Sequence, residues 1–159
     1  MSRHLNPLPP NLVNESSRMT EAYQAMYIFE NIIRHVIIMA LEKKHSNDWW
    51  EKPNMVSDGI KRNVEGRKHD EKKNPWHTIR GDHNVFYADF KDLDRIVKTN
   101  INEFKDVFGD SEIQAEMRQL ERSRNMISHD NFLSPREVER IKMHLKDLQK
   151  QLKLHTQEQ

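Results

Sequence analysis

The residues best suited to chemistry in this sequence form one short stretch, Arg124-Asn125-Met126-Ile127-Ser128-His129. An imidazole can donate or accept a proton near neutral pH, and a guanidinium offers a forked set of donors that fits a phosphate. When the 2′-hydroxyl of RNA is the nucleophile, cleavage requires only proton transfer and stabilisation of the charged phosphorane. Arg124 and His129 are therefore candidate catalytic residues for RNA cleavage without a metal ion.

Arg124 occupies a position where its helix is expected to carry an apolar residue. Ile113, Met117 and Leu120 are spaced by four and three residues, and the next step arrives at Arg124 before Ile127. Burying a guanidinium costs several kcal/mol unless an anion compensates its charge. We therefore expect Arg124 to face a protein carboxylate or a phosphate.

Asn125 is the third candidate catalytic residue, because it precedes His129 by four residues and shares a helix face with it. Its amide would fix the orientation and tautomer of the imidazole. Arg124 lies about 140° round a regular helix from His129, so we expect its long side chain to swing toward the histidine where the helix frays. Ser128 is a candidate supporting residue. Two copies packed together would bring two histidines and two arginines to one cleft.

The spacing alone is not specific, because Arg62 also precedes His69 at a similar distance, in a charged stretch without a strong apolar pattern. An arginine followed by a histidine after four to six residues is expected about twice by chance in a chain of this composition. The position of Arg124 on a core helix is what favours the pair Arg124 and His129.

Apolar spacing predicts four good helices that would position this motif. The first begins near Ser16 and is ended by Trp49, Trp50 and Pro53. It has apolar residues on two sides, so it is either central in the bundle or half-exposed for a second chain. The others are expected over about 86–108, 113–127 and 135–152. Gly109 would end the second, Asp110-Ser111 would cap the third, and Ser134 would cap the fourth in a capping box with Glu137.

Two segments differ from this pattern. Residues 1–14 contain Pro7, Pro9 and Pro10 and are expected to form an extended arm. Residues 54–83 form a charged insertion with a weakly amphipathic helix through Val56, Ile60 and Val64. The insertion has a local basic excess, which is either an RNA-binding patch or a solvated surface. The expected fold is one all-α domain over residues 1–159, a bundle of four to five helices with this insertion between the first and second core helices.

Composition limits the functional classes. The formal net charge of +1 gives no overall field that would recruit a polyanion, so nucleic-acid binding must come from local patches. The chain has no cysteine, which excludes disulfides and thiolate sites. The N-terminus lacks an apolar signal core, and the most apolar run is short and interrupted by charges. We expect a cytoplasmic protein that does not enter the membrane.

The chain resembles the HEPN superfamily, especially its branch in RNA-surveillance endonucleases and prokaryotic defence proteins. The resemblance covers about residues 84–150 and rests on this order of residues: Tyr87, Phe90, Leu93, Ile96 and Phe104, then Leu120, Arg124-Asn125, His129 and Leu133-Ser134. It implies an all-α bundle and, for active members, a dimeric ribonuclease without metal or cofactor that leaves a 2′,3′-cyclic phosphate. It also implies a toxin-like or antiviral role, with an antitoxin or ATPase as a partner. The alternative is a non-catalytic HEPN module that binds RNA or such a partner; a purely structural adaptor would leave Arg124 unexplained.

Glu30 and Arg34 are candidate supporting residues on the first helix. They are four residues apart and can pair with each other, or Glu30 can restrain Arg124 until phosphate arrives. Neither a metal nor a cofactor is expected, since the spacing of the acidic and imidazole side chains in the insertion matches no standard ligand set: His69, Asp70, His77, Asp82 and His83. Three tryptophans are expected to pack in the core rather than stack on bases: Trp49, Trp50 and Trp76.

Overall fold

The computed structural model describes residues 9–109 and 112–157, and within these ranges it contains helices and no strand. The expected all-α fold is confirmed. The elements are α1 (Pro10–His45), η1 (Trp49–Glu51), α2 (Asp58–Lys73), η2 (Asn84–Tyr87), α3 (Phe90–Thr99), η3 (Ile101–Phe104), α4 (Lys105–Phe108), α5 (Ile113–Ser128) and α6 (Pro135–Gln157). None of the helices in the described ranges combines the length and apolarity that crossing a bilayer requires.

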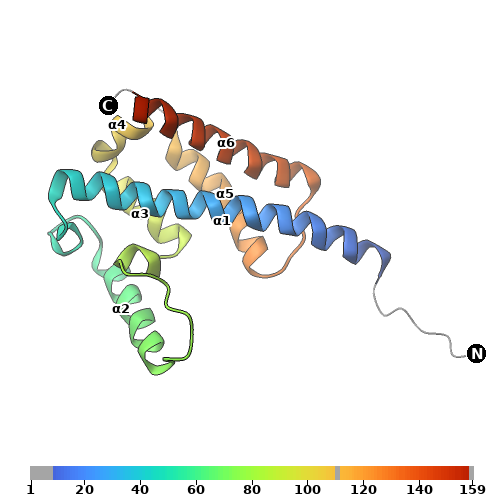
Figure 1. The fold of residues 1–159 in the computed structure, drawn as a ribbon, viewed down its shortest axis with the longest axis horizontal. Helices are drawn as coiled ribbons and strands as arrows, with labels where there is room; N and C mark the ends of the chain where they lie inside the picture. The colour runs from blue at the N-terminus through green and yellow to red at the C-terminus, as the bar shows by residue number, and fades with distance from the viewer. Residues whose placement is uncertain (1–8, 110–111, 158–159) are drawn as a thin grey trace, which may run out of the picture.

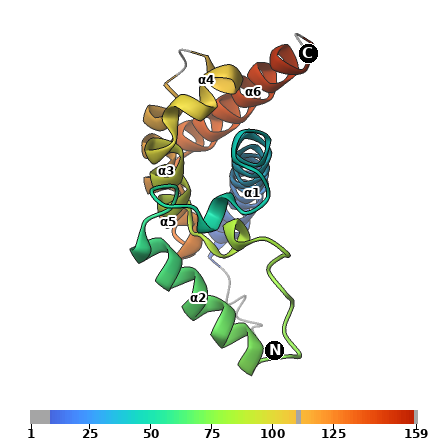
Figure 2. The same ribbon diagram turned by 90° about the vertical axis from the view of Figure 1, so that its left-hand side faces the viewer.

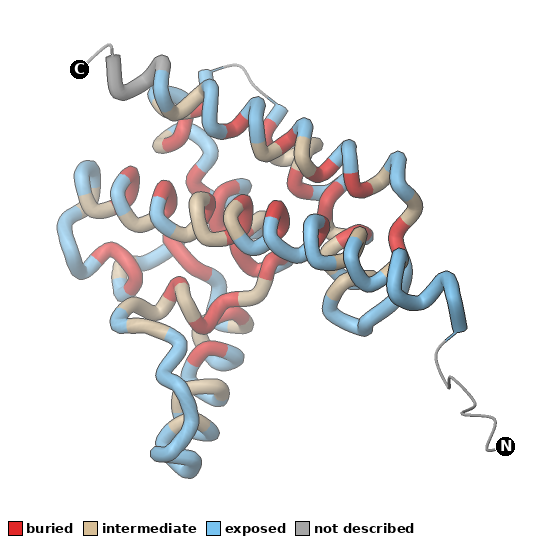
Figure 3. Tube along the Cα trace, turned by 45° about the vertical axis from the view of Figure 1, so that its right-hand side comes forward, coloured by how far each residue is buried: buried red, intermediate tan, exposed pale blue. Residues whose placement is uncertain are grey.

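The long helix α1 organises the bundle. It runs beside α6 and also packs on α3 and α5, while α2 projects away from the other helices (Figures 1 and 2). Buried residues lie on the sides of the helices that face one another, and the outer part of α2 is exposed (Figure 3). The largest fully buried side chains come from several elements: Phe29, Trp49, Phe90 and Phe104. Because α1 supplies one wall of this core, it fixes where α5 and its motif lie.

The extended arm expected over residues 1–14 is wrong for residues 10–14, which belong to α1. Pro10 stands at the first helical position, where the missing N–H costs no hydrogen bond and the fixed φ angle suits a helix. Residues 1–8 lie outside the described residues. One side of α1 is buried, and three large side chains outside that side are more than half exposed: Tyr23, Tyr27 and Met39.

The single helix expected over 86–108 is divided into four short elements. The break between α3 and η3 lies at Asn100, a buried residue whose side-chain amide donates to the carbonyls of Met55 and Ile96, each at 2.9 Å. These bonds tie the chain that follows η1 to the end of α3. Apolar spacing cannot reveal such a break, because the buried phenylalanines continue on both sides of it. Gly109 ends α4 with a positive φ of 57°, as expected, whereas Asp110-Ser111 lie outside the described residues.

The charged segment 54–83 contains the helix that its weak pattern predicted. In α2, Ile60 and Val64 are buried, and Ser57 accepts a hydrogen bond from the Ile60 N–H at the N-terminus. Arg67 joins this helix to the bundle, since its guanidinium donates to the Tyr87 carbonyl at 2.6 Å and to Asp89 at 3.2 Å. These contacts attach α2 to the bundle on its buried side.

The tryptophans divide between the core and the surface. Trp49 and Trp50 are buried, as expected, but the expectation for Trp76 is wrong, because 79% of it is exposed. His83 stacks on Trp49 with ring centroids 5.4 Å apart, and its burial lowers the pKa of the imidazole. Trp76 lies in an irregular connection that no helix covers. Core packing therefore accounts for two of the three indole rings.

The start of α6 follows the expected capping box. The Ser134 hydroxyl accepts from the Glu137 N–H at 3.3 Å, and the Glu137 carboxylate accepts from the Ser134 N–H at 3.1 Å. These reciprocal bonds satisfy backbone donors that a helix terminus otherwise leaves unpaired. They also fix the point at which the segment that follows the motif joins α6.

We predict that Ser134→Ala lowers the free energy of unfolding by about 1 kcal/mol, because it removes the N-cap acceptor of α6. Urea denaturation followed by far-ultraviolet circular dichroism measures the change. Ser134→Asp is the matched control, since aspartate also caps helices, and it should lose much less. Equal denaturation midpoints for Ser134→Ala and the unaltered chain would contradict this prediction.

Candidate functional site

Arg124 lies in the last turn of α5 and turns toward α1. Its Nε is 3.6 Å from Oε2 of Glu30, and 30% of its side chain is exposed. The neighbouring Ser123, not Arg124, continues the fully buried row of α5. The carboxylate that a half-buried guanidinium requires is thus Glu30, which reaches it from another helix.

Glu30 is shared between two arginines. Its Oε1 accepts from Arg34 Nη2 at 2.5 Å, one turn along α1, while its other oxygen faces Arg124. Arg34 also donates to Asn31 Oδ1 at 3.3 Å and to the Ala88 carbonyl at 3.2 Å. Both arrangements considered for Glu30 therefore occur together. Arg34 is fixed by several bonds, whereas Arg124 has a single, longer contact with the carboxylate.

His129 is the residue that ends α5. Its φ and ψ of −105° and 18° leave the helix, and its backbone N–H donates to the Asn125 carbonyl at 3.2 Å. The imidazole is exposed and lines a shallow hollow of about 410 Å³ together with Asn125, Arg118 and Arg122. In the described part of the chain the Asn125 amide makes no hydrogen bond to the imidazole. Asn125 thus shares the surroundings of His129 but does not fix its orientation here.

Arg124 and His129 line two different hollows. Arg124 belongs to a hollow beside α1, which it shares with Glu30, Arg34 and Ser128, and His129 does not line it. The expectation that Arg124 swings toward the histidine of the same chain is wrong. The helix stays regular to Ser128, whose hydroxyl donates to the Arg124 carbonyl at 2.9 Å, and Glu30 holds the guanidinium on the α1 side. Within one copy, the two groups do not converge on one anion.

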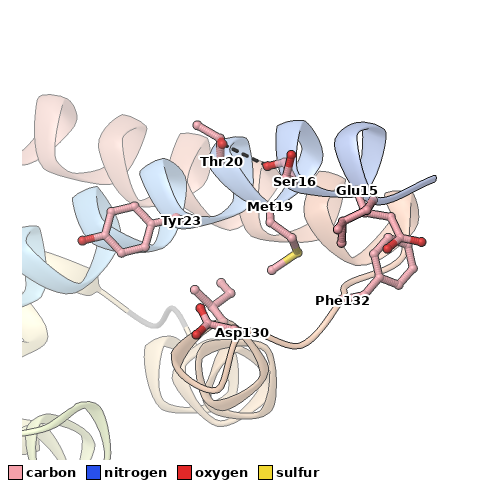
Figure 4. Close-up of a pocket in the computed structure, with 9 residues that line it drawn as sticks. Glu15, Ser16, Met19, Thr20, Tyr23, Asp130 and Phe132 are labelled. Carbon is pink, nitrogen blue, oxygen red and sulfur yellow. Dashed lines mark hydrogen bonds between the residues drawn. The ribbon is translucent and has the colours of Figure 1, made fainter. Parts of the chain in front are cut away.

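The segment that follows His129 is anchored on the first turns of α1. Met19 of α1 lies over this segment in a groove of about 430 Å³, where Asp130 and Phe132 also line the wall (Figure 4). The Leu133 N–H donates to the sulfur of Met19 at 3.3 Å, and the guanidinium of Arg18 lies 5.4 Å from the Phe132 ring centroid. These contacts restrain the turn on which His129 stands.

Several residues beside the motif were not found from the sequence. Arg80 reaches the Arg124 hollow from the connection before η2, and Tyr23 and Tyr27 reach it from α1. Arg80 was part of the basic excess of the 54–83 insertion, but nothing in the spacing indicated which of those cations approaches the motif. The apolar spacing of the first helix did not indicate that Tyr23 and Tyr27 lie exposed beside the motif.

A family model described as Swt1-like HEPN matches residues 24–153, from α1 through the motif and into α6. No curated protein and no solved structure matches the chain.

We predict that Glu30→Gln lowers the free energy of unfolding by about 2 kcal/mol. The change removes the only carboxylate within 4.0 Å of either Arg34 or Arg124 in the described part of the chain, and an uncompensated, largely buried guanidinium is costly. Chemical denaturation measures the loss.

The control is Glu65→Gln, which breaks an exposed pair with Lys68 on α2 and should cost less than about 0.5 kcal/mol. If both variants unfold at the same denaturant concentration, Glu30 does not stabilise the α1 and α5 contact as described.

Proposed function

The chain belongs to the Swt1-like HEPN family, and on that premise we propose that it is a metal-independent endoribonuclease. The observation that carries the proposal is the chemistry at the end of α5. His129 presents an exposed imidazole, and Arg124 has one contact with Glu30 at 3.6 Å, which leaves guanidinium donors for a phosphate. In this proposal His129 is the general acid or base and Arg124 holds the scissile phosphate. Asn125 lines the same hollow as His129 and would orient the imidazole once RNA is bound.

The proposed reaction is attack of the 2′-oxygen of RNA on the adjacent phosphorus. The bond between phosphorus and the 2′-oxygen forms as the bond to the 5′-oxygen breaks, and the product is a 2′,3′-cyclic phosphate. A proton leaves the 2′-hydroxyl and another is gained by the 5′-oxygen. One imidazole serves one of these transfers at a time, and water is the proton donor or acceptor in the other. Arg124 would stabilise the extra negative charge of the phosphorane.

The working enzyme in this proposal is a homodimer, since the two groups line separate hollows in one copy. A two-fold contact would let Arg124 of one protomer and His129 of the partner subunit face the same phosphate. Leu12 and Val13, exposed apolar side chains in the first turn of α1, support such a contact. The symmetric arrangement would give two equivalent sites.

A toxin-like or antiviral role, with control by an antitoxin or an ATPase, is the biological part of the proposal and rests on the family alone. The second candidate function is a non-catalytic module that binds RNA or such a partner protein. The separation of Arg124 from His129 favours this alternative, because a single copy has no assembled cleavage site. The ribonuclease requires His129 for its activity, whereas the binding module does not.

We predict that the purified protein cleaves RNA in the presence of EDTA and that His129→Ala lowers the rate by about a hundredfold or more, the usual contribution of a general acid or base. Gel analysis of end-labelled RNA measures the rate, and phosphatase resistance of the new 3′-end identifies the cyclic product. His69→Ala, at an exposed histidine of α2, is the matched control and should cleave normally. Binding of RNA without cleavage by any of the three proteins would favour the module.

We predict that mixing inactive Arg124→Ala with inactive His129→Ala restores cleavage. In a mixed dimer one site loses both groups and the other retains both, so random exchange gives about a quarter of the normal activity. Activity is measured after subunits exchange. Failure of an exchanged mixture to recover activity would show that Arg124 and His129 of the same chain act together, and would contradict the shared site.

A further inference from the structure

The hollow that contains Arg124 has the size and position of a ligand site. It measures about 380 Å³ and lies between α1, the connection that leads to η2, and the last turn of α5. Sites for small ligands are usually roughly 300 to 1,000 Å³ in volume. Six of its lining residues carry the argument and define what we name the Arg–Tyr hollow: Tyr23, Tyr27, Glu30, Arg34, Arg80 and Arg124.

Positive charge exceeds negative charge in the Arg–Tyr hollow. Three guanidinium groups line it, and Glu30 supplies one carboxylate, which contacts Arg34 and Arg124. Across residues 9–109 and 112–157, no carboxylate lies within 4.0 Å of the Arg80 guanidinium. Buried Arg34 Nε also has no hydrogen-bond partner. Glu71, outside the hollow, accepts from the Arg80 backbone N–H at 3.0 Å and interacts electrostatically with the Arg80 side chain. The lining side chains themselves carry two more positive than negative charges, which suits a phosphate.

Two aromatic rings stand at the same hollow. Tyr23 and Tyr27 are 59% and 58% exposed, and their rings stack on each other with centroids 6.1 Å apart and planes 28° from parallel. Exposed aromatic rings beside cationic side chains are the combination with which proteins bind unpaired nucleotides, the ring stacking on the base and the cation contacting the phosphate.

The charge of the hollow argues against a second copy of this chain as its direct cover. In a two-fold contact whose axis passes through the hollow, arginines would face arginines across the axis. Like charges in such a contact are unfavourable unless an anion lies between them. A polyanion that enters the hollow removes this conflict.

We propose that the Arg–Tyr hollow is a subsite for one nucleotide of single-stranded RNA. The phosphate contacts Arg80 and Arg124, and the base stacks on Tyr27, with Tyr23 supporting that ring from behind. The assignment rests on the proposed ribonuclease function and adds to it the position of the nucleotide beside the scissile phosphate. Because every base has a stacking face, the subsite selects unpaired RNA rather than a particular base.

The test measures binding without cleavage. The probe is a fluorescent oligouridylate with 2′-O-methyl groups, which lacks the nucleophile, and every protein carries His129→Ala, a residue outside the hollow. Tyr27→Leu is expected to weaken binding about tenfold, in line with the contribution of one stacked base. Tyr27→Phe keeps the ring and should bind within about threefold of the parent.

Arg80 is tested by the salt dependence of the same binding. Arg80→Ala should weaken binding and lower the slope of log K against log salt by about 0.7, the value for one phosphate contact with a single strand. Arg62→Ala removes an exposed arginine of α2 outside the hollow and should leave the slope unchanged. Inorganic polyphosphate has no bases, so its binding should be weakened by Arg80→Ala but not by Tyr27→Leu.

The results distinguish failure of this subsite from failure of the proposed ribonuclease function. If RNA binds and Tyr27→Leu and Arg80→Ala weaken it, while the unaltered protein does not cleave RNA, the subsite stands and the ribonuclease proposal fails. If the unaltered protein cleaves RNA but these variants bind as Arg62→Ala does, the subsite is wrong and the ribonuclease proposal stands. Sedimentation supplies a further check: conversion of a dimer to a monomer by Tyr27→Leu, with RNA affinity retained, would assign the face to a second copy and overturn the subsite.

Discussion

The pairing of one carboxylate with two guanidinium groups determines the surroundings of the motif. Glu30 accepts from Arg34 at 2.5 Å on its own helix and faces Arg124 of α5 at 3.6 Å. Because a largely buried carboxylate needs positive partners, the contact joins α1 to the end of α5. The carboxylate also holds Arg124 on the α1 side, so the charge of that hollow follows from the same interaction. An anion entering there would meet a guanidinium already positioned by Glu30.

The second constraint is the geometry of a helix end. Since α5 stays regular through Ser128, Arg124 and His129 leave it in different directions and line separate hollows. The turn after His129 is restrained by Met19 and by the capping box at Ser134, so it does not bring the imidazole back toward α1. In the proposed function a second copy of the chain supplies the missing group, which connects dimer formation to the proposed chemistry.

Much of this arrangement could be predicted from the sequence. Apolar spacing located α1, α5 and α6, and the cation in the apolar pattern of α5 indicated that Arg124 faces a carboxylate or a phosphate. The start of α1 at Pro10 was missed because proline forbids a helix interior but suits its first turn. The break at Asn100 depends on hydrogen bonds to Met55 and Ile96, and the approach of Arg80 depends on an irregular connection. Such tertiary contacts have no periodic signature.

The central claim is that Arg124 of one protomer and His129 of the partner subunit act on the same phosphate. A crystal structure of the protein with a 2′-deoxy oligonucleotide, which binds without being cleaved by this reaction, tests it directly. We expect one phosphate within hydrogen-bond distance of both groups, contributed by different protomers across a two-fold axis. An oligonucleotide bound far from His129, or a phosphate contacted by both groups of a single chain, would contradict the claim.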